Sequence, residues 1–301
     1  MFPLKSARML AALLLALSLM TFSAACGGGD DDEEDIAEED AAGATETAGV
    51  KYAPTGNEGS VTGTIAFAGT APAPKSISMD QDPVCSSSNP NALAEDLVVK
   101  DGKLQNVFVY VKDGKTADGK NITALAFDPP AQPAVLDQKG CHYVPHVLGI
   151  QTGQKLSVTN SDQTAHNVNV QANSNPKFNK SQPPAAAPIE QAFNRAETLI
   201  PVKCNQHPWM KSYIGVLKHP FFGVSGEDGK FEIKGLPPGT YTLVAWHERY
   251  GDKQQQASVT IGQKETKTQD FSFAATTASN TLSGGTLQLM PALELPMLGQ
   301  H

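Results

Sequence analysis

The sequence has few long stretches with the periodicity of an amphipathic helix, and only 18% of its 301 residues are charged. It is rich instead in turn formers, with 26 glycines and 21 prolines. Short runs of β-branched and aromatic residues recur between turn signals, for example at 60–69, 105–114 and 228–248. This rhythm predicts an all-β protein built from one or two β-sandwich domains, rather than a helical protein.

The chain also has no excess of positive charge. Ten of its 31 acidic residues lie in residues 30–46, and residues 51–301 hold 21 residues of each sign. The acidic pI of 5.4 therefore describes one low-complexity run. We expect residues 26–57 to form a disordered, self-repelling tether. The charge balance elsewhere gives no indication of a nucleic-acid-binding surface.

The start of the chain has the layout of a secretory signal over residues 1–25. Lys5 and Arg8 precede an apolar run at 9–20 that is too short for a comfortable membrane span. Cys26 follows small residues, and this arrangement resembles the lipidated cysteine of bacterial lipoproteins. The resemblance implies an exported protein, anchored by lipid on the periplasmic or extracellular face of a bacterial membrane. Cleavage of an ordinary signal peptide is the alternative.

Only four cysteines are present, and an oxidising compartment gives them separate roles. With Cys26 carrying lipid, we expect Cys85 and Cys141 to form a disulfide and Cys204 to stay free. A lone thiol outside the cytoplasm is a liability unless something holds it, and a metal would do so. An inert buried Cys204, or a different pairing, is the alternative.

Three metal-capable side chains follow one another at three-residue spacing in the segment CNQHPWM, namely Cys204, His207 and Met210. The alternation of apolar residues turns Cys204 and His166 toward the interior, each from the end of a predicted strand. One thiolate, two imidazoles and a thioether form a soft set that favours copper, because methionine is a poor ligand for zinc. Core packing is the alternative for Met210, which would leave three ligands.

These segments resemble a known family. CNQHPWM is similar to the C-x-x-H-P-aromatic-M copper loop of amicyanins, and AHNVNV, at 165–170, resembles the strand of amicyanins and plastocyanins that carries the first histidine. The resemblance implies a cupredoxin Greek-key β-sandwich over residues 121–222 that binds one type 1 copper.

The same resemblance implies a role for each residue of the motif. The three equatorial ligands would be His166, Cys204 and His207, and the axial ligand would be Met210. Asn167 would steady the ligand loop. His207 and Trp209 would form the edge through which electrons pass.

A second resemblance covers the rest of the folded chain. DGKFEIKGLPPGTYTLVAWHE, at 228–248, is similar to the second half of a carboxypeptidase-regulatory-like (prealbumin-like) β-sandwich. It implies a domain over 58–120 and 223–274, with the cupredoxin domain inserted into one of its loops. Two sandwiches in series, or one enlarged sandwich, are the alternatives.

Two segments lack the strand rhythm. Residues 172–196 combine Pro, Asn and Ala, and we expect a long loop there with a helical turn near 189–195. Residues 275–301 show no clear period and are expected to be a poorly ordered tail.

These features predict an exported, membrane-tethered electron carrier that serves a redox partner protein and is not an enzyme. A copper enzyme would need an open coordination position and further histidines near the metal, such as His142 or His146. H-x-H pairs of the multicopper-oxidase kind are absent from the sequence. Besides an enzyme, the alternatives are a copper storage or delivery module and a non-catalytic surface module. We expect structural roles for His142, His146, His219 and His247.

Overall fold

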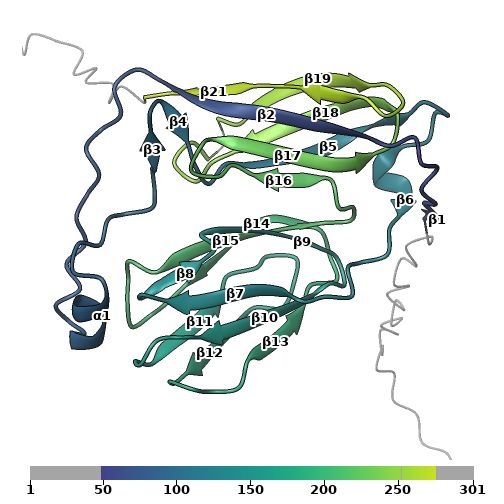
Figure 1. The fold of residues 1–301 in the computed structure, drawn as a ribbon. Helices are drawn as coiled ribbons and strands as arrows, with labels where there is room; N and C mark the ends of the chain where they lie inside the picture. Colours follow the sequence, from purple (N-terminus) through teal and green to yellow (C-terminus); the bar gives the residue numbers. More distant parts are fainter. Residues whose placement is uncertain (1–48, 252, 276–301) are drawn as a thin grey trace, which may run out of the picture. The chain divides into compact units, whose positions relative to one another are not determined.

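The computed structural model describes residues 49–251 and 253–275. The signal at 1–25, the lipidated Cys26, most of the tether, and the tail after residue 275 lie outside these ranges. Within them the chain is nearly all β, as predicted (Figure 1). It forms strands β1 to β21, one six-residue helix, α1 (Pro83–Ser88), and one 3-10 turn, η1 (Ile122–Ala124). None of the helices in the described ranges has the length and apolar character needed to span a lipid bilayer.

One β-sandwich, named here the split sandwich, takes its strands from residues 59–116 and 222–274. Its first sheet has the order β16-β5-β18-β19, formed by Phe222–Val224, Phe108–Thr116, Gly239–Trp246 and Gln255–Ile261. Its second sheet has the order β17-β2-β4-β3, formed by Lys230–Leu236, Gly59–Ala68, Lys103–Leu104 and Val99–Lys100. Two further strands, β20 (Thr266–Thr268) and β21 (Phe271–Ala274), pair with β2.

The other sandwich, named here the central sandwich, takes its strands from residues 134–217. Its smaller sheet has the order β13-β10-β7-β8, formed by Ile189–Ala192, Lys155–Asn160, Ala134–Lys139 and His142–Val144. Its larger sheet has the order β12-β11-β14-β15-β9, formed by Phe178–Gln182, His166–Val170, Glu197–Lys203, Lys211–Leu217 and Val147–Gln151. Strand β6 (Leu125–Ala126), which follows β5 along the chain, pairs with β1 (Val50–Lys51). The expectation of a disordered tether over residues 26–57 is therefore wrong at residues 50–51, which this backbone pairing holds in a strand.

Alternating side chains explain both sandwiches. In β2 every second residue from Gly59 to Phe67 is buried and the residues between them are only partly buried, so one face of the strand contributes to the core. Each sandwich has its own buried cluster of apolar residues. A third, smaller cluster joins residues of both, including Phe108 and Val244 from the split sandwich and Val147 and Leu217 from the central one. The strand membership is compatible with an inserted domain, and the boundaries at 121 and 222 remain predictions.

The expectation of a long loop over residues 172–196 is wrong. The segment contains β12, which pairs antiparallel with β11, and β13, which pairs antiparallel with β10. Both strands lie at the edge of their sheets, β12 mostly exposed and β13 mostly half-buried, so they need few apolar residues. The sequence signal for a strand is therefore weak, and the helical turn expected near 189–195 is strand β13 over its first four residues.

A segment inside the predicted 58–120 range leaves the split sandwich. Between β2 and β3 the chain runs to the central sandwich, forms α1 there and returns (Figure 1). Met79, Cys85 and Ala92 are buried in the apolar cluster of the central sandwich. We name residues 76–93 the cover segment, because its residues Asp82 and Cys85 lie against His207, one of the candidate metal ligands.

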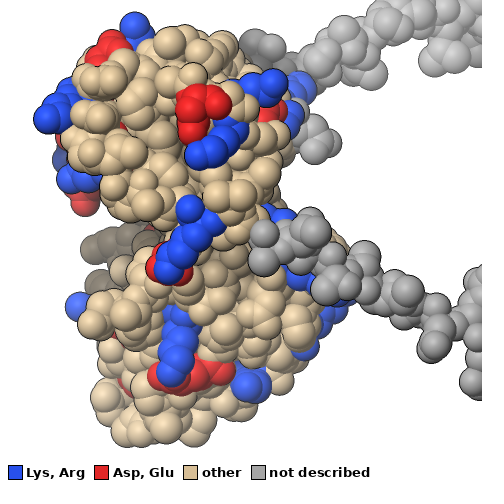
Figure 2. Space-filling model, turned by 90° about the vertical axis from the view of Figure 1, so that its right-hand side faces the viewer, with Lys and Arg blue, Asp and Glu red and all other residues tan. Residues whose placement is uncertain are grey.

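Charged residues of both signs lie interspersed on the face drawn in Figure 2, among mostly uncharged side chains. The ion pairs that involve lysines are exposed, as for Lys51 with Asp128 and Lys155 with Glu190. Exposed pairs of this kind contribute little to stability.

Candidate metal centre

Two strands of the larger central sheet bring the first two candidate ligands together. His166 is the first residue of β11, and Cys204 directly follows β14, which pairs with β11. His166 is 0% exposed and Cys204 is 3% exposed. Both side chains thus face the interior, because they continue the alternation of apolar residues along their strands.

The loop after β14 brings the third candidate ligand back to the first two. The backbone N–H of Cys204 donates to the carbonyl oxygen of Met210 (3.2 Å), and the N–H of Met210 donates to the carbonyl of His207 (2.9 Å). These bonds close a tight turn before β15 resumes pairing. Met210 is fully buried in the same apolar cluster as Cys204, and its role as axial ligand remains a prediction.

The ligand atoms of three of these residues converge. His166 Nδ1 lies 2.9 Å from His207 Nδ1, and Cys204 Sγ lies 3.7 Å from His207 Nδ1. All three atoms lie within 4.8 Å of one another. A single ion placed among them could contact two imidazole nitrogens and one sulfur.

Asn167 ties the ligand loop to the strand that carries His166. Its Oδ1 accepts hydrogen bonds from the backbone N–H of Asn205 (2.6 Å) and from the thiol of Cys204 (3.4 Å). Its amide nitrogen donates to Asn179 on β12. The carbonyl of Asn167 also accepts a hydrogen bond from the Tyr143 hydroxyl. The structure thus places Asn167 where it can steady the loop.

Each histidine has a carboxylate on the nitrogen that faces away from the other ligands. Asp162 Oδ2 lies 2.9 Å from His166 Nε2, and Asp82 Oδ2 lies 3.2 Å from His207 Nε2. A carboxylate on the outer nitrogen of a metal-ligating histidine fixes the tautomer and makes the ring a more basic ligand. Both rings therefore keep Nδ1 for a metal.

A tight hairpin turn orients Asp162. Gly140 and Cys141 connect β7 to β8, with φ angles of 63° and 57°, so two successive residues adopt the left-handed conformation. The backbone N–H groups of both residues donate to the Asp162 carboxylate, at 2.7 and 2.8 Å. Asp162 is thereby held in place to accept from His166.

Burial and hydrogen bonding oppose each other at these groups. Burial lowers the pKa of His166, but its hydrogen bonds to Asp162 and Cys204 outweigh burial and raise the pKa to about 9. Burial raises the pKa of the Cys204 thiol, whereas the hydrogen bond with His166 and backbone donors lower it by more, so the net pKa is lowered. Burial and the neighbouring His166 lower the pKa of His207. The pocket thus favours a thiolate beside a positive charge.

The donor set fits a type 1 copper ion. It combines a thiolate-prone sulfur, two Nδ1 atoms with fixed tautomers and a buried methionine nearby, which is the composition of blue-copper sites. Two neighbouring groups of potential ligands also exist. One group is Asp82, Cys85 and His207, and the other is Cys141, Asp162 and His166. The sulfurs of the two groups are joined to each other in the Cys85–Cys141 disulfide. They offer no thiolate to a metal.

The structure joins Cys85 and Cys141 across 56 residues and leaves Cys204 as the free cysteine of the described ranges. His207, expected at the surface as the electron-transfer edge, is only 4% exposed. The physical reason is that Asp82 and Cys85 lie against its ring, with Cys85 Sγ 3.8 Å from Nε2. Trp209 stays partly exposed, its ring centre 5.1 Å from that of His207, and its indole N–H donates to the carbonyl of Cys141.

The other four histidines of the described residues lie outside this group of ligand atoms. His142 and His146 both face the carboxylate of Glu95, and His146 also pairs with Glu248. His219 packs against Phe221, with ring centres 5.4 Å apart.

The carboxylate partners of the two histidines, Asp82 and Asp162, were not predicted from the sequence. Asp82 carries a local signal, since Asp followed by Pro is typical of a helix N-cap with Pro at the first helical position. That signal predicts the helix but says nothing of His207, which is 125 residues away. Asp162 has no comparable local signature, because its role depends on the hairpin turn at Gly140 and Cys141.

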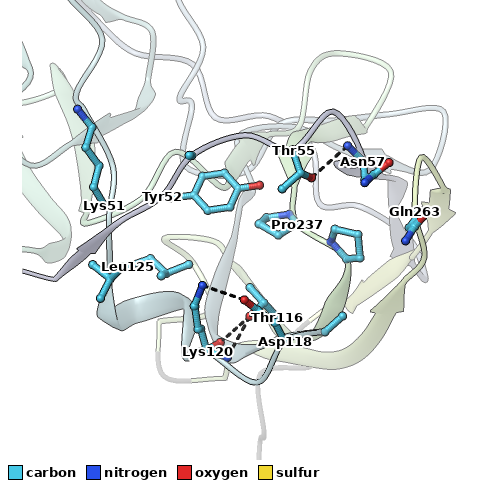
Figure 3. Close-up of a pocket in the computed structure, with 14 residues that line it drawn as sticks. Lys51, Tyr52, Thr55, Asn57, Thr116, Asp118, Lys120, Leu125, Pro237 and Gln263 are labelled. Carbon is cyan, nitrogen blue, oxygen red and sulfur yellow. Dashed lines mark hydrogen bonds and ion pairs between the residues drawn. The ribbon is translucent and has the colours of Figure 1, made fainter.

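A pocket of about 380 Å³ lies elsewhere, at one end of the split sandwich (Figure 3). Tyr52, Leu125 and Pro237 give it apolar walls, and the ion pair of Lys120 with Asp118 lies on its rim. It contains no histidine or cysteine among its lining residues. Its size alone does not connect it with the metal centre.

Comparisons with known proteins cover parts of the chain. The family model described as polysaccharide lyase family 4, domain II, matches residues 221–269. No curated protein matches the chain.

Three solved structures are similar to parts of the chain. A copper-containing nitrite reductase from Thermus scotoductus SA-01 is 20% identical, with 30% of this chain and 25% of that one covered and a TM-score of 0.27. The chain thus spans about a quarter of that reductase. A purple cupredoxin from Nitrosopumilus maritimus is 21% identical over 28% of this chain and 98% of its own, with a TM-score of 0.24. A reduced amicyanin variant is 20% identical over 30% and 91%, with a TM-score of 0.25. Scores this low carry no argument about function, which has to come from the site itself.

Proposed function

We propose that the chain is a type 1 copper protein that transfers single electrons between redox partners. The observation that carries this proposal is the convergence of His166 Nδ1, His207 Nδ1 and Cys204 Sγ within 4.8 Å in a buried pocket. When bound there, copper would supply a one-electron couple between Cu(II) and Cu(I).

The protein's part is to hold the ligands still. His166 and Cys204 come from paired strands, and the loop to Met210 is closed by backbone hydrogen bonds, so the donors are fixed by the sandwich itself. A pocket that keeps one geometry for both oxidation states lowers the reorganisation that each transfer requires. In this proposal Met210 is the axial ligand, and Asn167 steadies the loop.

Burial favours an electron carrier over an enzyme. The three converging residues are at most 4% exposed, which disfavours direct contact between a substrate and a metal that they hold. His142 and His146, which a second copper would need, have Glu95 and Glu248 as partners instead. Electrons would then pass between His207 and the surface through the partly exposed Trp209.

We further propose that the signal at 1–25 exports the chain and that lipid on Cys26 anchors it to a bacterial membrane. The acidic run after Cys26 would let the folded part search for a redox partner protein, since such encounters use small interfaces. What supports this is the layout of the sequence, together with the disulfide, which is typical of exported proteins.

Adding Cu(II) to the purified chain tests the copper assignment. We expect an intense visible thiolate-to-copper band that disappears on reduction and returns on oxidation. Cys204→Ser should remove the band, whereas His142→Asn, outside the site, should keep it. A colourless wild-type protein, or a band that survives Cys204→Ser, would refute the assignment. A band that shifts on addition of azide or nitrite would favour the enzyme.

A further inference from the structure

The cover segment is a closed and anchored loop. An antiparallel bridge joins Ser76 to Leu93, and the N–H of Ile77 donates to the carbonyl of Ala92 (2.9 Å), so the two ends of the segment are held together. Met79 and Ala92 are buried in the core of the central sandwich. The segment is therefore part of the wall of the metal centre, although the strands on either side of it belong to the split sandwich.

The two carboxylate oxygens of Asp82 make separate sets of contacts. Oδ1 caps α1 by accepting from the backbone N–H groups of Val84 (2.8 Å) and Cys85 (3.2 Å). Oδ2 accepts from the Thr164 hydroxyl (2.6 Å) and faces His207 Nε2 (3.2 Å). Capping fixes the first oxygen, so the position of the second follows from the start of the helix.

Two further contacts hold α1 against the metal centre. Cys85, in the middle of the helix, is joined to Cys141 by the disulfide. The side-chain amide of Asn89, at the end of the helix, donates to the carbonyl of Gly140 (3.4 Å). Both contacts reach the same hairpin turn that orients Asp162, so one turn supports the partners of both histidines.

Given the proposed copper site, on which this inference rests, we propose that Asp82 is a positioning residue for His207 and that the cover segment shields the bound metal from external chelators. The Asp82 carboxylate accepts the Nε2–H of His207, so that Nδ1 remains directed at the metal. The negative charge makes the ring a stronger donor to Cu(II), which favours the oxidised state and lowers the reduction potential.

The substitution Asp82→Asn separates the capping of α1 by Oδ1 from the contact of Oδ2 with His207. Asparagine is as good an N-cap as aspartate, so its Oδ1 keeps α1 in place. Its amide NH₂ then faces the Nε2–H of His207, which places a donor against a donor. Asp80→Asn is the matched control, because Asp80 lies on the same segment, is exposed and bonds only to Ser78 among the described contacts.

The experiment uses the full copper-loaded chain and two measurements. We expect Asp82→Asn to lose copper to an excess of chelator about tenfold faster than wild type or more, as loss of an outer-shell partner typically does. Its reduction potential should rise, while Asp80→Asn matches wild type in both. If the wild type binds copper but Asp82→Asn behaves like Asp80→Asn, the positioning role is refuted. A wild type that binds no copper refutes the proposed function instead.

A metal-free measurement tests the cover separately. In wild type, Cys204 should react slowly with an aromatic disulfide reagent, followed by the mass of its peptide, because the site is covered. Replacing Cys85 and Cys141 by serine should free α1 and accelerate labelling at least several-fold, with circular dichroism checking that the sheets persist. An unchanged rate in a folded double variant would overturn the cover, and Asp82→Asn still tests the contact if that variant fails to fold.

Discussion

The histidines of the metal centre and those beside the split sandwich are buried to the same degree, yet their chemistry differs. His166 and His207 are at most 4% exposed, and so are His219 and His247. His247 packs among aromatic rings, and burial lowers its pKa and that of His219 to about 4. His166 faces Asp162 and Cys204, which raise its pKa to about 9. Burial alone keeps a histidine neutral, whereas fixed anionic neighbours and convergence with other donors make it a candidate ligand.

His146 combines features of both groups of histidines. It faces Glu95 from the chain after the cover segment and Glu248 from the loop after β18, but no sulfur lies beside it. Burial lowers its pKa, but the hydrogen bond to Glu248 and the negative charges of both carboxylates outweigh burial and raise the pKa to about 9. We name the ion pairs of His146 with Glu95 and Glu248 the clasp; they do not form a donor set for copper.

The largest expected difference between the two regions is in copper binding after a histidine is replaced by phenylalanine. His166→Phe should weaken copper binding by more than about 100-fold, because losing even an outer-shell partner costs 10–100-fold. His247→Phe should keep copper binding and change the free energy of unfolding by less than about 2 kcal/mol, since it loses a single hydrogen bond, from the Arg249 N–H to Nδ1, while Nε2 has no partner to lose. Copper titration and urea unfolding measure the two effects. Equal copper affinities in both variants would contradict the ligand assignment.

Removing the disulfide should destabilise the central sandwich selectively. Closing a 56-residue loop corresponds to about 4 kcal/mol in the chain-entropy model, so replacing Cys85 and Cys141 by alanine should lower the free energy of unfolding by up to that amount. The two tryptophans report separately, because Trp209 lies on the ligand loop and Trp246 ends β18. Urea titrations of Trp209→Phe and Trp246→Phe backgrounds should show the loss mainly in the signal of Trp209. Equal losses in both signals would mean that the sandwiches unfold as one unit.

The clasp at His146 should make stability depend on pH. Its pKa of about 9 in the folded protein exceeds the ordinary value of 6.5, so its stabilisation is complete below about pH 6.5 and is lost as the pH rises through 9. The difference corresponds to at most about 3 kcal/mol. Glu248→Gln should flatten this part of the profile, whereas Glu190→Gln, whose carboxylate is exposed, should leave it unchanged. Because His166 also has a raised pKa of about 9, the two profiles are compared: a Glu248→Gln profile identical to that of wild type from pH 6.5 to 9.5 would rule out a charged His146.

The smallest effect compares two buried methionines of one core. Met210→Leu should keep copper bound but change its reduction potential, because only the weak axial donor is lost. Met79→Leu should leave the potential unchanged. Both substitutions conserve volume, so each should alter the free energy of unfolding by less than about 1.5 kcal/mol. Voltammetry would expose a wrong axial assignment if both variants kept the wild-type potential.

The strands that build the site were predictable, because alternation in β11 and β14 already turns His166 and Cys204 inward. The spacing of His207 and Met210 after Cys204 placed the loop. The edge strands β12 and β13 were missed, because strands at the edge of a sheet need few apolar residues. The burial of His207 was also missed, since it results from contacts with Asp82 and Cys85, which are more than 120 residues away. Local patterns carry no information about contacts at that separation.

The ring of His207 also has a consequence for thiol chemistry. Cys204 Sγ lies 3.7 Å from its Nδ1, and Cys85 Sγ lies 3.8 Å from its Nε2, so one imidazole stands between a free thiol and a disulfide. Thiol–disulfide exchange requires a thiolate to reach a disulfide sulfur directly. The imidazole therefore lies on the approach from Cys204 to the Cys85 sulfur, where it would hinder exchange at that sulfur.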